Sequence, residues 1–371
     1  MKGRRPRPLD DGDSGEVRVS GHLSWAKPIK NKRGFYLTQS ATITFMSIIS
    51  NCTAPVINNA AASLVVGNLV AFPTETVYGL GADATNENAV ARIYEVKDRP
   101  IGHPLIVHIS SIKYLEKWAR DVPEYAIQLA RNFWPGPMTL ILPRTPLAKD
   151  FITGGQDNVG IRVPSHNVAL ELIREFESQG GLGIAAPSAN RFGKVSPTSA
   201  KAVSDELSNY LTSADLILDG GPCVVGVESS IINCTQDTPT ILRPGAVTTE
   251  MIYKKIGILV KQNNEYIGEF KIKASGLLES HYAPAAKVFL SVNTQPGDGF
   301  IAYSSISTPK GTVRLASPKN NDEYANLIYQ ALRLADSKQL QRVVVIPPTN
   351  EGIGIAINDR LDKAAYLLSQ E

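Results

Sequence analysis

The chain has few cysteines and no long apolar run, and each shortage excludes a class of protein. Only three cysteines occur in 371 residues, and no two of them form a Cys-x-x-Cys pair. We therefore expect neither a disulfide framework nor a structural zinc site. No run of 18 apolar residues occurs, so we expect no membrane-spanning helix. Free thiols in a chain without a span predict a cytoplasmic protein.

Several familiar catalytic motifs are also missing. There is no Gly-x-x-x-x-Gly-Lys-Ser/Thr loop, so a nucleotide would not be held as it is in P-loop proteins. No Gly-x-Gly-x-x-Gly follows a strand, which disfavours a dinucleotide cofactor. There is no Gly-x-Ser-x-Gly elbow, and nothing suggests a Cys–His pair.

The positive charge of the chain is concentrated at its N-terminus. The whole chain has a formal net charge of +3. The first 35 residues contain nine Lys or Arg against four Asp or Glu, so the remainder carries about −2. We expect residues 1–45 to be a disordered basic tail. The rest of the chain offers no overall nucleic-acid-binding charge.

The apolar pattern predicts an α/β protein with two units. Strands and helices interleave from residue 50 onward, yet several strands also follow one another directly, which favours a mixed sheet. We expect Leu69–Phe72 to be a strand and Thr85 to cap a helix that ends near Lys97. A first domain over 50–259, a linker or lid over 260–284 and a small α/β domain over 285–371 account for the pattern.

Three short motifs place polar groups beside glycine or proline. FPTETVYGLG at 72–81 is a buried strand that breaks into hydroxyls and a carboxylate, KDRP spans 97–100, and APSAN spans 186–190. Hydroxyl, amide and cationic groups in such settings are what a small anionic ligand requires. The three motifs together predict a ligand site at the end of the sheet.

Each single residue also has a structural interpretation. Lys97 and Arg99 suit a phosphate, but they also suit a solvated helix C-terminus. Ser188 and Asn190 are either phosphate ligands or a cap or turn. Arg162 lies on an alternating apolar strand beside Gly160, where a carboxylate ligand and a structural ion pair are equally reasonable.

The remaining candidates are more ambiguous when taken singly. His108 would ordinarily be a core or edge histidine. Arg243, before Pro244 and Gly245, is typical of a surface turn, and Glu228-Ser-Ser230 is typical of a simple β-turn. Only the order of all these motifs along one chain gives a distinct prediction.

In that order, the motifs resemble the YrdC/Sua5 family of threonylcarbamoyl-adenylate synthases. Residues 55–257 resemble the YrdC-like domain, and the chain from 285 resembles the Sua5-specific domain, which ends in IGIAINDRLDKAA at 353–365. The resemblance implies a twisted mixed β-sheet with a deep basic cavity and a Rossmann-like C-terminal domain. It also implies a reaction that joins L-threonine, bicarbonate and ATP into L-threonylcarbamoyl-adenylate, with release of pyrophosphate.

The resemblance also assigns residues. It implies Lys97 and Arg99 as catalytic residues, and no metal site on the protein. The threonine-binding positions would be Thr76, His108, Arg162, Ala186 (through its backbone) and Ser229. The ATP-binding positions would be Arg99, His103, Asn158, Ser188, Asn190, Ser196 and Arg243.

The same resemblance implies partners and a moving part. Mg²⁺ would accompany the ATP phosphates, and the product would pass to the transferase machinery that makes t6A at position 37 of ANN-decoding tRNAs, with a weak tRNA contact. The linker with His281 and Tyr282 would act as a lid over the unstable adenylate.

Three other functions compete with this one. The first is an RNA-binding module, which the nearly neutral folded part and the lack of an aromatic and basic stacking surface disfavour. The second is a carbamoyltransferase of the hydrogenase-maturation kind, which would also carry an acylphosphatase domain and zinc motifs. The third is a metabolite sensor that uses the same pocket without turnover.

Overall fold

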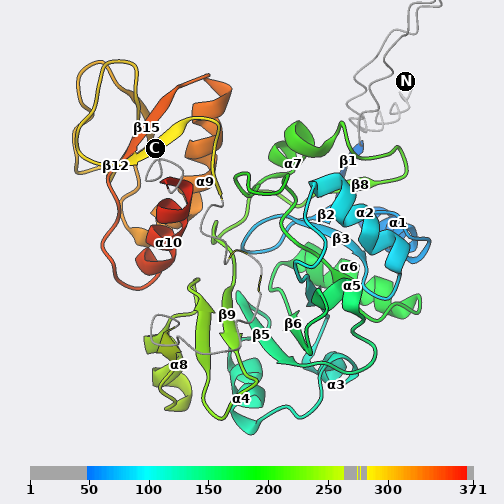
Figure 1. Ribbon diagram of the computed structural model, residues 1–371. Coiled ribbons are helices and arrows are strands. Elements are labelled where there is room, and N and C mark those ends of the chain that lie inside the picture. The colour runs from blue at the N-terminus through cyan, green and yellow to red at the C-terminus, as the bar shows by residue number, and fades with distance from the viewer. Residues whose placement is uncertain (1–47, 263–273, 275, 277–281, 366–371) are drawn as a thin grey trace, which may run out of the picture. The chain divides into compact units, whose positions relative to one another are not determined.

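The strands of the described chain form two separate sheets. The computed structural model describes residues 48–262, 274, 276 and 282–365, and the predicted tail 1–45 and most of the predicted linker lie outside them. These described residues fall in one compact unit, Phe45–Glu371. The larger sheet has eleven strands in the order β1-β8-β2-β3-β7-β4-β6-β5-β9-β10-β11. Figure 1 labels β1, β2, β3, β5, β6, β8 and β9 of this sheet. Its strands are β1 (Ile48–Asn51), β2 (Val70–Phe72), β3 (Gly79–Asp83), β4 (Ile106–His108), β5 (Met138–Pro143), β6 (Asn158–Arg162), β7 (Ile184–Ala185), β8 (Leu216–Asp219), β9 (Ser230–Asn233), β10 (Thr240–Arg243) and β11 (Lys261–Gln262).

The larger sheet is mixed, which confirms the predicted α/β class. β4 and β6 pair in parallel, whereas β5 and β6 pair antiparallel. β2 and β3 form an antiparallel pair around the Pro-Thr-Glu-Thr turn. The parallel register places His108 opposite Arg162, so two predicted ligand residues meet at the ends of adjacent strands.

Helices cover the larger sheet and begin at polar or proline caps. They are α1 (Ala54–Val65), α2 (Glu87–Lys97), η1 (Ile112–Tyr114), α3 (Leu115–Trp118), α4 (Glu124–Phe133), α5 (Asp150–Thr153), α6 (Asn167–Ser178), α7 (Ala200–Leu207) and α8 (Thr249–Ile256). The cap of α2 corrects a prediction: Asn86 accepts the amide hydrogen of Ala89 at 3.1 Å, whereas Thr85 bonds backward to Asp83. A side chain can accept this bond from the N-cap position, and Thr85 lies one residue too early.

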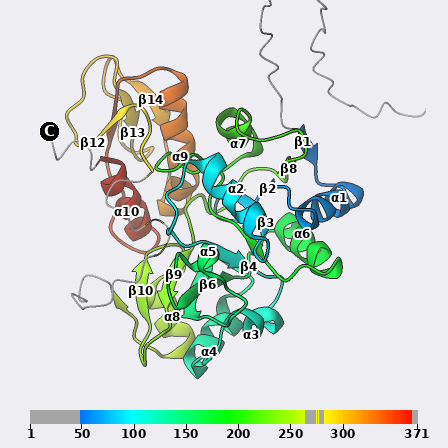
Figure 2. The ribbon, with the colours of Figure 1, turned by 45° about the vertical axis from the view of Figure 1, so that its right-hand side comes forward.

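One helix pair shows how the apolar period sets the packing. α1 lies beside α6 (Figure 2) and buries Ile57, Ala60, Ala61 and Leu64. This is the face that the 3.6-residue period predicts. Val65 also falls near this stripe in sequence, but it is 41% exposed because it lies at the last helical position.

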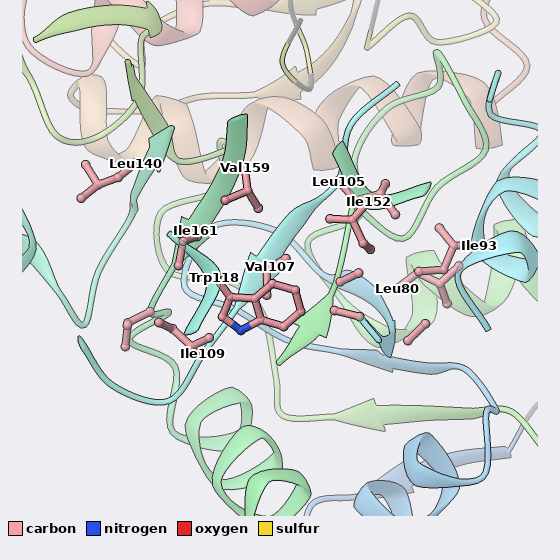
Figure 3. Packing of buried hydrophobic residues seen from close by; sticks show 14 of the residues in the cluster. Leu80, Ile93, Leu105, Val107, Ile109, Trp118, Leu140, Ile152, Val159 and Ile161 are labelled. Carbon is pink, nitrogen blue, oxygen red and sulfur yellow. The ribbon is translucent and has the colours of Figure 1, made fainter. Parts of the chain in front are cut away.

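The core of the larger sheet is built around β4 and β6. Val107, Ile109 and Ile161 pack with Trp118, as Figure 3 shows, and Trp118 is fully buried. The indole Nε1 donates to the Leu182 carbonyl oxygen at 3.1 Å, so the buried polar group is satisfied. This packing fixes the strands whose ends carry His108 and Arg162.

The smaller sheet is entirely parallel in the described chain. Its order is β12-β15-β13-β14, with α9 packed on β14 and α10 on β12. The elements are β12 (Lys287–Leu290), β13 (Gly299–Ile301), β14 (Val313–Ala316), α9 (Asn321–Ser337), β15 (Arg342–Val345) and α10 (Gly354–Ala365).

No helix in the described part of the chain is both long and apolar enough to cross a bilayer.

Candidate functional site

The turn between β2 and β3 is held by one hydroxyl group. Thr74 Oγ1 donates to the Val77 carbonyl oxygen at 2.6 Å and accepts from the amide groups of Thr76 and Val77, each at 3.2 Å. A hydroxyl that satisfies its own turn in this way fixes the backbone without help from solvent. The side chains of Glu75 and Thr76 are consequently held in buried positions.

Arg162, at the end of β6, contacts both of these side chains. Its Nη2 lies 2.7 Å from Glu75 Oε1 and donates to Thr76 Oγ1 at 3.0 Å. Glu75 Oε2 accepts the amide hydrogen of Ser165 at 3.1 Å. The structural ion pair considered for Arg162 is therefore present, yet its buried Nε has no hydrogen-bond partner among the described residues.

His108 is a buried neutral histidine beside Arg162. Burial, and then the charge of Arg162, lower its pKa to about 3. Its Nδ1 lies 3.2 Å from the Ile106 carbonyl oxygen, and its ring packs edge-on against Phe72. A neutral imidazole can exchange a hydrogen bond with a hydroxyl but adds no charge. The nearby Ala186 amide donates to the Ile106 carbonyl oxygen at 3.0 Å, so that N–H belongs to the sheet.

Ser229 and Arg243 form a second buried group at the start of β9 and the end of β10. Arg243 donates to the Ser229 carbonyl oxygen from Nε and Nη2, at 3.1 and 3.0 Å, and to Ser229 Oγ at 3.1 Å. The Ser229 hydroxyl also lies 2.8 Å from Thr139 Oγ1. The surface turn that the sequence allowed for Arg243 is wrong, because the side chain is 3% exposed.

Glu228 joins this group to the smaller sheet. Its Oε1 accepts from Ser196 Oγ at 2.6 Å, and its Oε2 accepts from Tyr329 of α9 at 2.9 Å and from Arg360 Nε of α10 at 3.1 Å. Burial raises the pKa of Glu228, but Arg360 and then Arg243 outweigh it and bring the pKa to about 2. No sequence pattern indicated a role for Arg360 or Tyr329, although Arg360 lies inside the 353–365 motif.

Lys97 holds the APSAN loop. The ammonium donates to the Ser188 carbonyl oxygen at 2.6 Å and to the Asn190 carbonyl oxygen. Burial and then the nearby Arg99 lower its pKa, while the two carbonyl acceptors favour the charged form. The solvated helix C-terminus that the sequence allowed is therefore wrong for Lys97, which is 2% exposed.

Arg99 lies beside an aromatic ring that the sequence analysis did not single out. Its guanidinium lies 5.6 Å from the Phe192 ring centroid, and His103 packs on the same ring at 5.3 Å. Arg99 Nη2 donates to the Pro104 carbonyl oxygen at 3.0 Å, while its buried Nε has no hydrogen-bond partner among the described residues. Burial lowers the Arg99 pKa to about 10, which leaves it charged at neutral pH.

A backbone bridge connects two of the candidate motifs. Ser188 pairs with Gly79 across an isolated bridge, which joins the APSAN loop to the strand after the Pro-Thr-Glu-Thr turn. Asn190 Nδ2 donates within its own loop, and its buried Oδ1 has no partner among the described residues. Asn158 starts β6, two residues before Gly160, which pairs with Ile106 of β4.

All four cationic candidates are buried. Lys97, Arg99, Arg162 and Arg243 are each at most 6% exposed, so none of them lies on an outer surface. Within the described part of the chain there is no group of three or more His, Cys, Asp or Glu side chains that could hold a metal ion. The buried cationic side chains can therefore neutralise an anion from fixed positions.

Two family models match the chain in succession. The Sua5/YciO/YrdC model, described as "Telomere recombination", matches residues 62–245. The model described as "Threonylcarbamoyl-AMP synthase, C-terminal domain" matches residues 247–366. The second match begins next to α8, although Ile252 of that helix packs in the core of the larger sheet.

The chain matches curated relatives over nearly their full length. The threonylcarbamoyl-AMP synthase of Pyrococcus abyssi is 39% identical over 82% of this chain and 93% of its own. That of Bacillus subtilis is 40% identical over 84% of this chain and 93% of its own. The crystal structure of P. abyssi Sua5 complexed with L-threonine matches with a TM-score of 0.77 and 38% identity, over 86% of this chain and 98% of that one. The chain therefore belongs to the Sua5/YrdC family of threonylcarbamoyl-AMP synthases.

Proposed function

We propose that this chain condenses L-threonine, bicarbonate and ATP into L-threonylcarbamoyl-adenylate and pyrophosphate. The product would serve t6A synthesis at position 37 of ANN-decoding tRNAs, in the cytoplasm. The observation that carries the proposal is a set of buried cations with unused donors: the Nε atoms of Arg99 and Arg162 have no partner among the described residues. A buried donor without a hydrogen bond costs about 1–3 kcal/mol, and an anionic ligand that accepted this bond would recover that free energy.

The threonine end of the site is assigned to Arg162 and the polar groups around it. Arg162 would pair with the carboxylate, and the hydroxyls of Thr76 and Ser229 with neutral His108 would surround the polar groups of the side chain. A buried partner for the substrate hydroxyl would reject an analogue that lacks it, because the partner would be left unpaired. Ala186 would contribute through its backbone.

The nucleotide end is assigned to the cations and hydroxyls around it. The residues that would hold ATP are Arg99, His103, Asn158, Ser188, Asn190, Ser196 and Arg243. Lys97 sets the position of the Ser188 and Asn190 loop through two carbonyl groups. The carbamate oxygen would attack the α-phosphorus and pyrophosphate would leave, a step that needs positioning and charge stabilisation more than a protein nucleophile.

Magnesium is assigned to the nucleotide and not to the protein. The buried carboxylate nearest to the nucleotide residues, Glu228, is already bonded to Ser196, Tyr329 and Arg360. The described residues therefore do not fit a resident metal site, and Mg²⁺ would arrive as the counter-ion of ATP.

The test is pyrophosphate release with each substrate left out in turn. We expect release to require ATP, threonine and bicarbonate together. Release that persists without threonine, or no release with all three, would contradict the proposal. A salt-dependent tRNA shift without pyrophosphate would instead support an RNA-binding module, and ligand binding without turnover would support a sensor.

A further inference from the structure

Glu75 is a buried carboxylate to which neither the sequence analysis nor the proposed chemistry gives a role. Its side chain is 5% exposed, and its Oε1 faces Arg162 Nη2 at 2.7 Å. The same Oε1 makes no hydrogen bond of good geometry among the described residues. The carboxylate thus has one fixed oxygen, on the Ser165 amide, and one oxygen with capacity to spare.

The charges around Glu75 leave it as the one anion in contact with Arg162 in the described part of the chain. His108, on β4, is neutral because burial and Arg162 hold its pKa near 3. Cys223 is a protonated thiol, since burial raises its pKa to about 12. His166, at the start of α6, has its pKa lowered by burial, while the charge of Glu75 acts in the opposite direction. Arg162 and Glu75 therefore form a pair of zero net charge.

A zwitterion balances this pair, whereas a simple anion does not. If only a carboxylate bound to Arg162, two negative groups would share one guanidinium in a buried place. An amino acid brings an ammonium beside its carboxylate, so each of the four charges can meet an opposite one. An unpaired buried ion costs several kcal/mol, so the ammonium needs a partner where it lies.

We propose that Glu75 binds the α-ammonium of the amino-acid substrate and accepts its proton. The proton moves from nitrogen to Glu75 Oε1, and the free amine then attacks the carbon of bicarbonate. The new N–C bond forms, and the bicarbonate hydroxyl leaves as water with a proton from the attacking nitrogen. This inference rests on the proposed function and adds a residue that makes the amine reactive at neutral pH.

The experiment is the pH profile of Glu75→Gln in the full-length protein, read as threonine-dependent pyrophosphate release. At neutral pH we expect kcat/KM for threonine to fall about 100-fold, the low end of general-base contributions. The deficit should shrink as the pH rises, because the free amine of threonine becomes more abundant in solution. A deficit that stays constant at every pH, or no deficit at all, overturns the inference.

A second measurement does not depend on the folding of the variant. Wild-type protein should bind L-threonine at least about tenfold more tightly than 3-hydroxybutanoate, which lacks only the amine, because a charge-assisted bond is lost. Equal affinities overturn the inference.

The matched control for the pH profile is Glu177→Gln. Glu177 is a half-buried carboxylate bonded to Ser110, and its replacement should leave the profile unchanged. Absent release in the wild type would instead count against the proposed function.

Discussion

At the scale of single residues, partners decide what a side chain can do. Arg162 was predicted from an alternating strand with an arginine beside a glycine, and its side chain does point to Thr76. Its pairing with Glu75 was beyond prediction, because the two residues are far apart in sequence and only the sheet brings them together. That pairing also means that Arg162→Ala would leave a buried carboxylate alone, which costs about 3–5 kcal/mol of stability.

Replacement by lysine separates binding from folding at this position. Arg162→Lys keeps a positive charge for Glu75 but loses the planar fork that grips a carboxylate. We expect kcat/KM for threonine to fall about 10- to 100-fold with the thermal midpoint nearly unchanged, since one charge-assisted bond is worth about 1.5–3 kcal/mol. Arg144→Lys, at an ion pair with exposed Asp150, is the control. Unchanged kinetics in Arg162→Lys would refute the carboxylate-binding role.

Lys97 was assigned to catalysis, and its contacts define how it would act. It donates to two carbonyl oxygens of the APSAN loop, so Lys97→Ala should loosen Ser188 and Asn190. We expect calorimetry to show ATP binding weakened by about tenfold, with threonine binding less affected, because an unsatisfied buried group costs about 1–3 kcal/mol. The reverse order of effects would sink this assignment. Lys201→Ala, an exposed lysine paired with Asp205, should change neither affinity.

At the scale of elements, the sequence predicts the helices and strands that have a regular apolar pattern, but it does not predict those that lack one. The predicted strand Leu69–Phe72 is β2 (Val70–Phe72), and the predicted helix that ends near Lys97 is α2 (Glu87–Lys97). β3 was not predicted, because its sequence Gly-Leu-Gly-Ala-Asp has the glycines of a loop. Gly81 is required there, since a Cβ would lie 2.8 Å from the Phe72 ring and 2.9 Å from Ile184. Packing between strands that are distant in sequence gave β3 its place, and no local pattern records it.

The start of α2 offers a direct test of cap assignment. Asn86→Ala removes the acceptor for the Ala89 amide and should cost about 1 kcal/mol in urea unfolding. Thr85→Ala is the matched control and should cost less, because Thr85 Oγ1 donates to Asp83 in its own turn. A larger loss in Thr85→Ala than in Asn86→Ala would restore the cap that the sequence suggested.

At the scale of the whole molecule, one carboxylate connects the two sheets. Glu228 accepts a hydrogen bond from the nucleotide residue Ser196, and Tyr329 of α9 and Arg360 of α10 donate to the same carboxylate. The sequence predicted the presence of the C-terminal unit but not this contact. The ends of the two sheets meet through side chains that the sequence separates by more than 100 residues.

The pH dependence of stability should report this connection. The folded pKa of Glu228, about 2, lies below its ordinary value of 4.5, so the pairing stabilises the protein above pH 4.5 and the gain is lost as the pH falls toward 2. The shift corresponds to about 3 kcal/mol. We expect wild type to exceed Glu228→Gln in unfolding free energy at pH 6, with the gap closing by pH 2–3 in denaturant titrations. A gap that does not vary with pH would refute the assignment.

The neighbouring Gly226 shows how little room this junction has. Its φ is +87°, and a Cβ at this position would overlap the carbonyl oxygen of Ala325 in α9. The backbone of Gly226, two residues before Glu228, therefore packs directly against the backbone of α9. A methyl group at position 226 would push α9 away. Because Glu228 follows two residues later, the displacement would reach the nucleotide end of the site. The space between Gly226 and α9 is thus too small for one additional carbon atom.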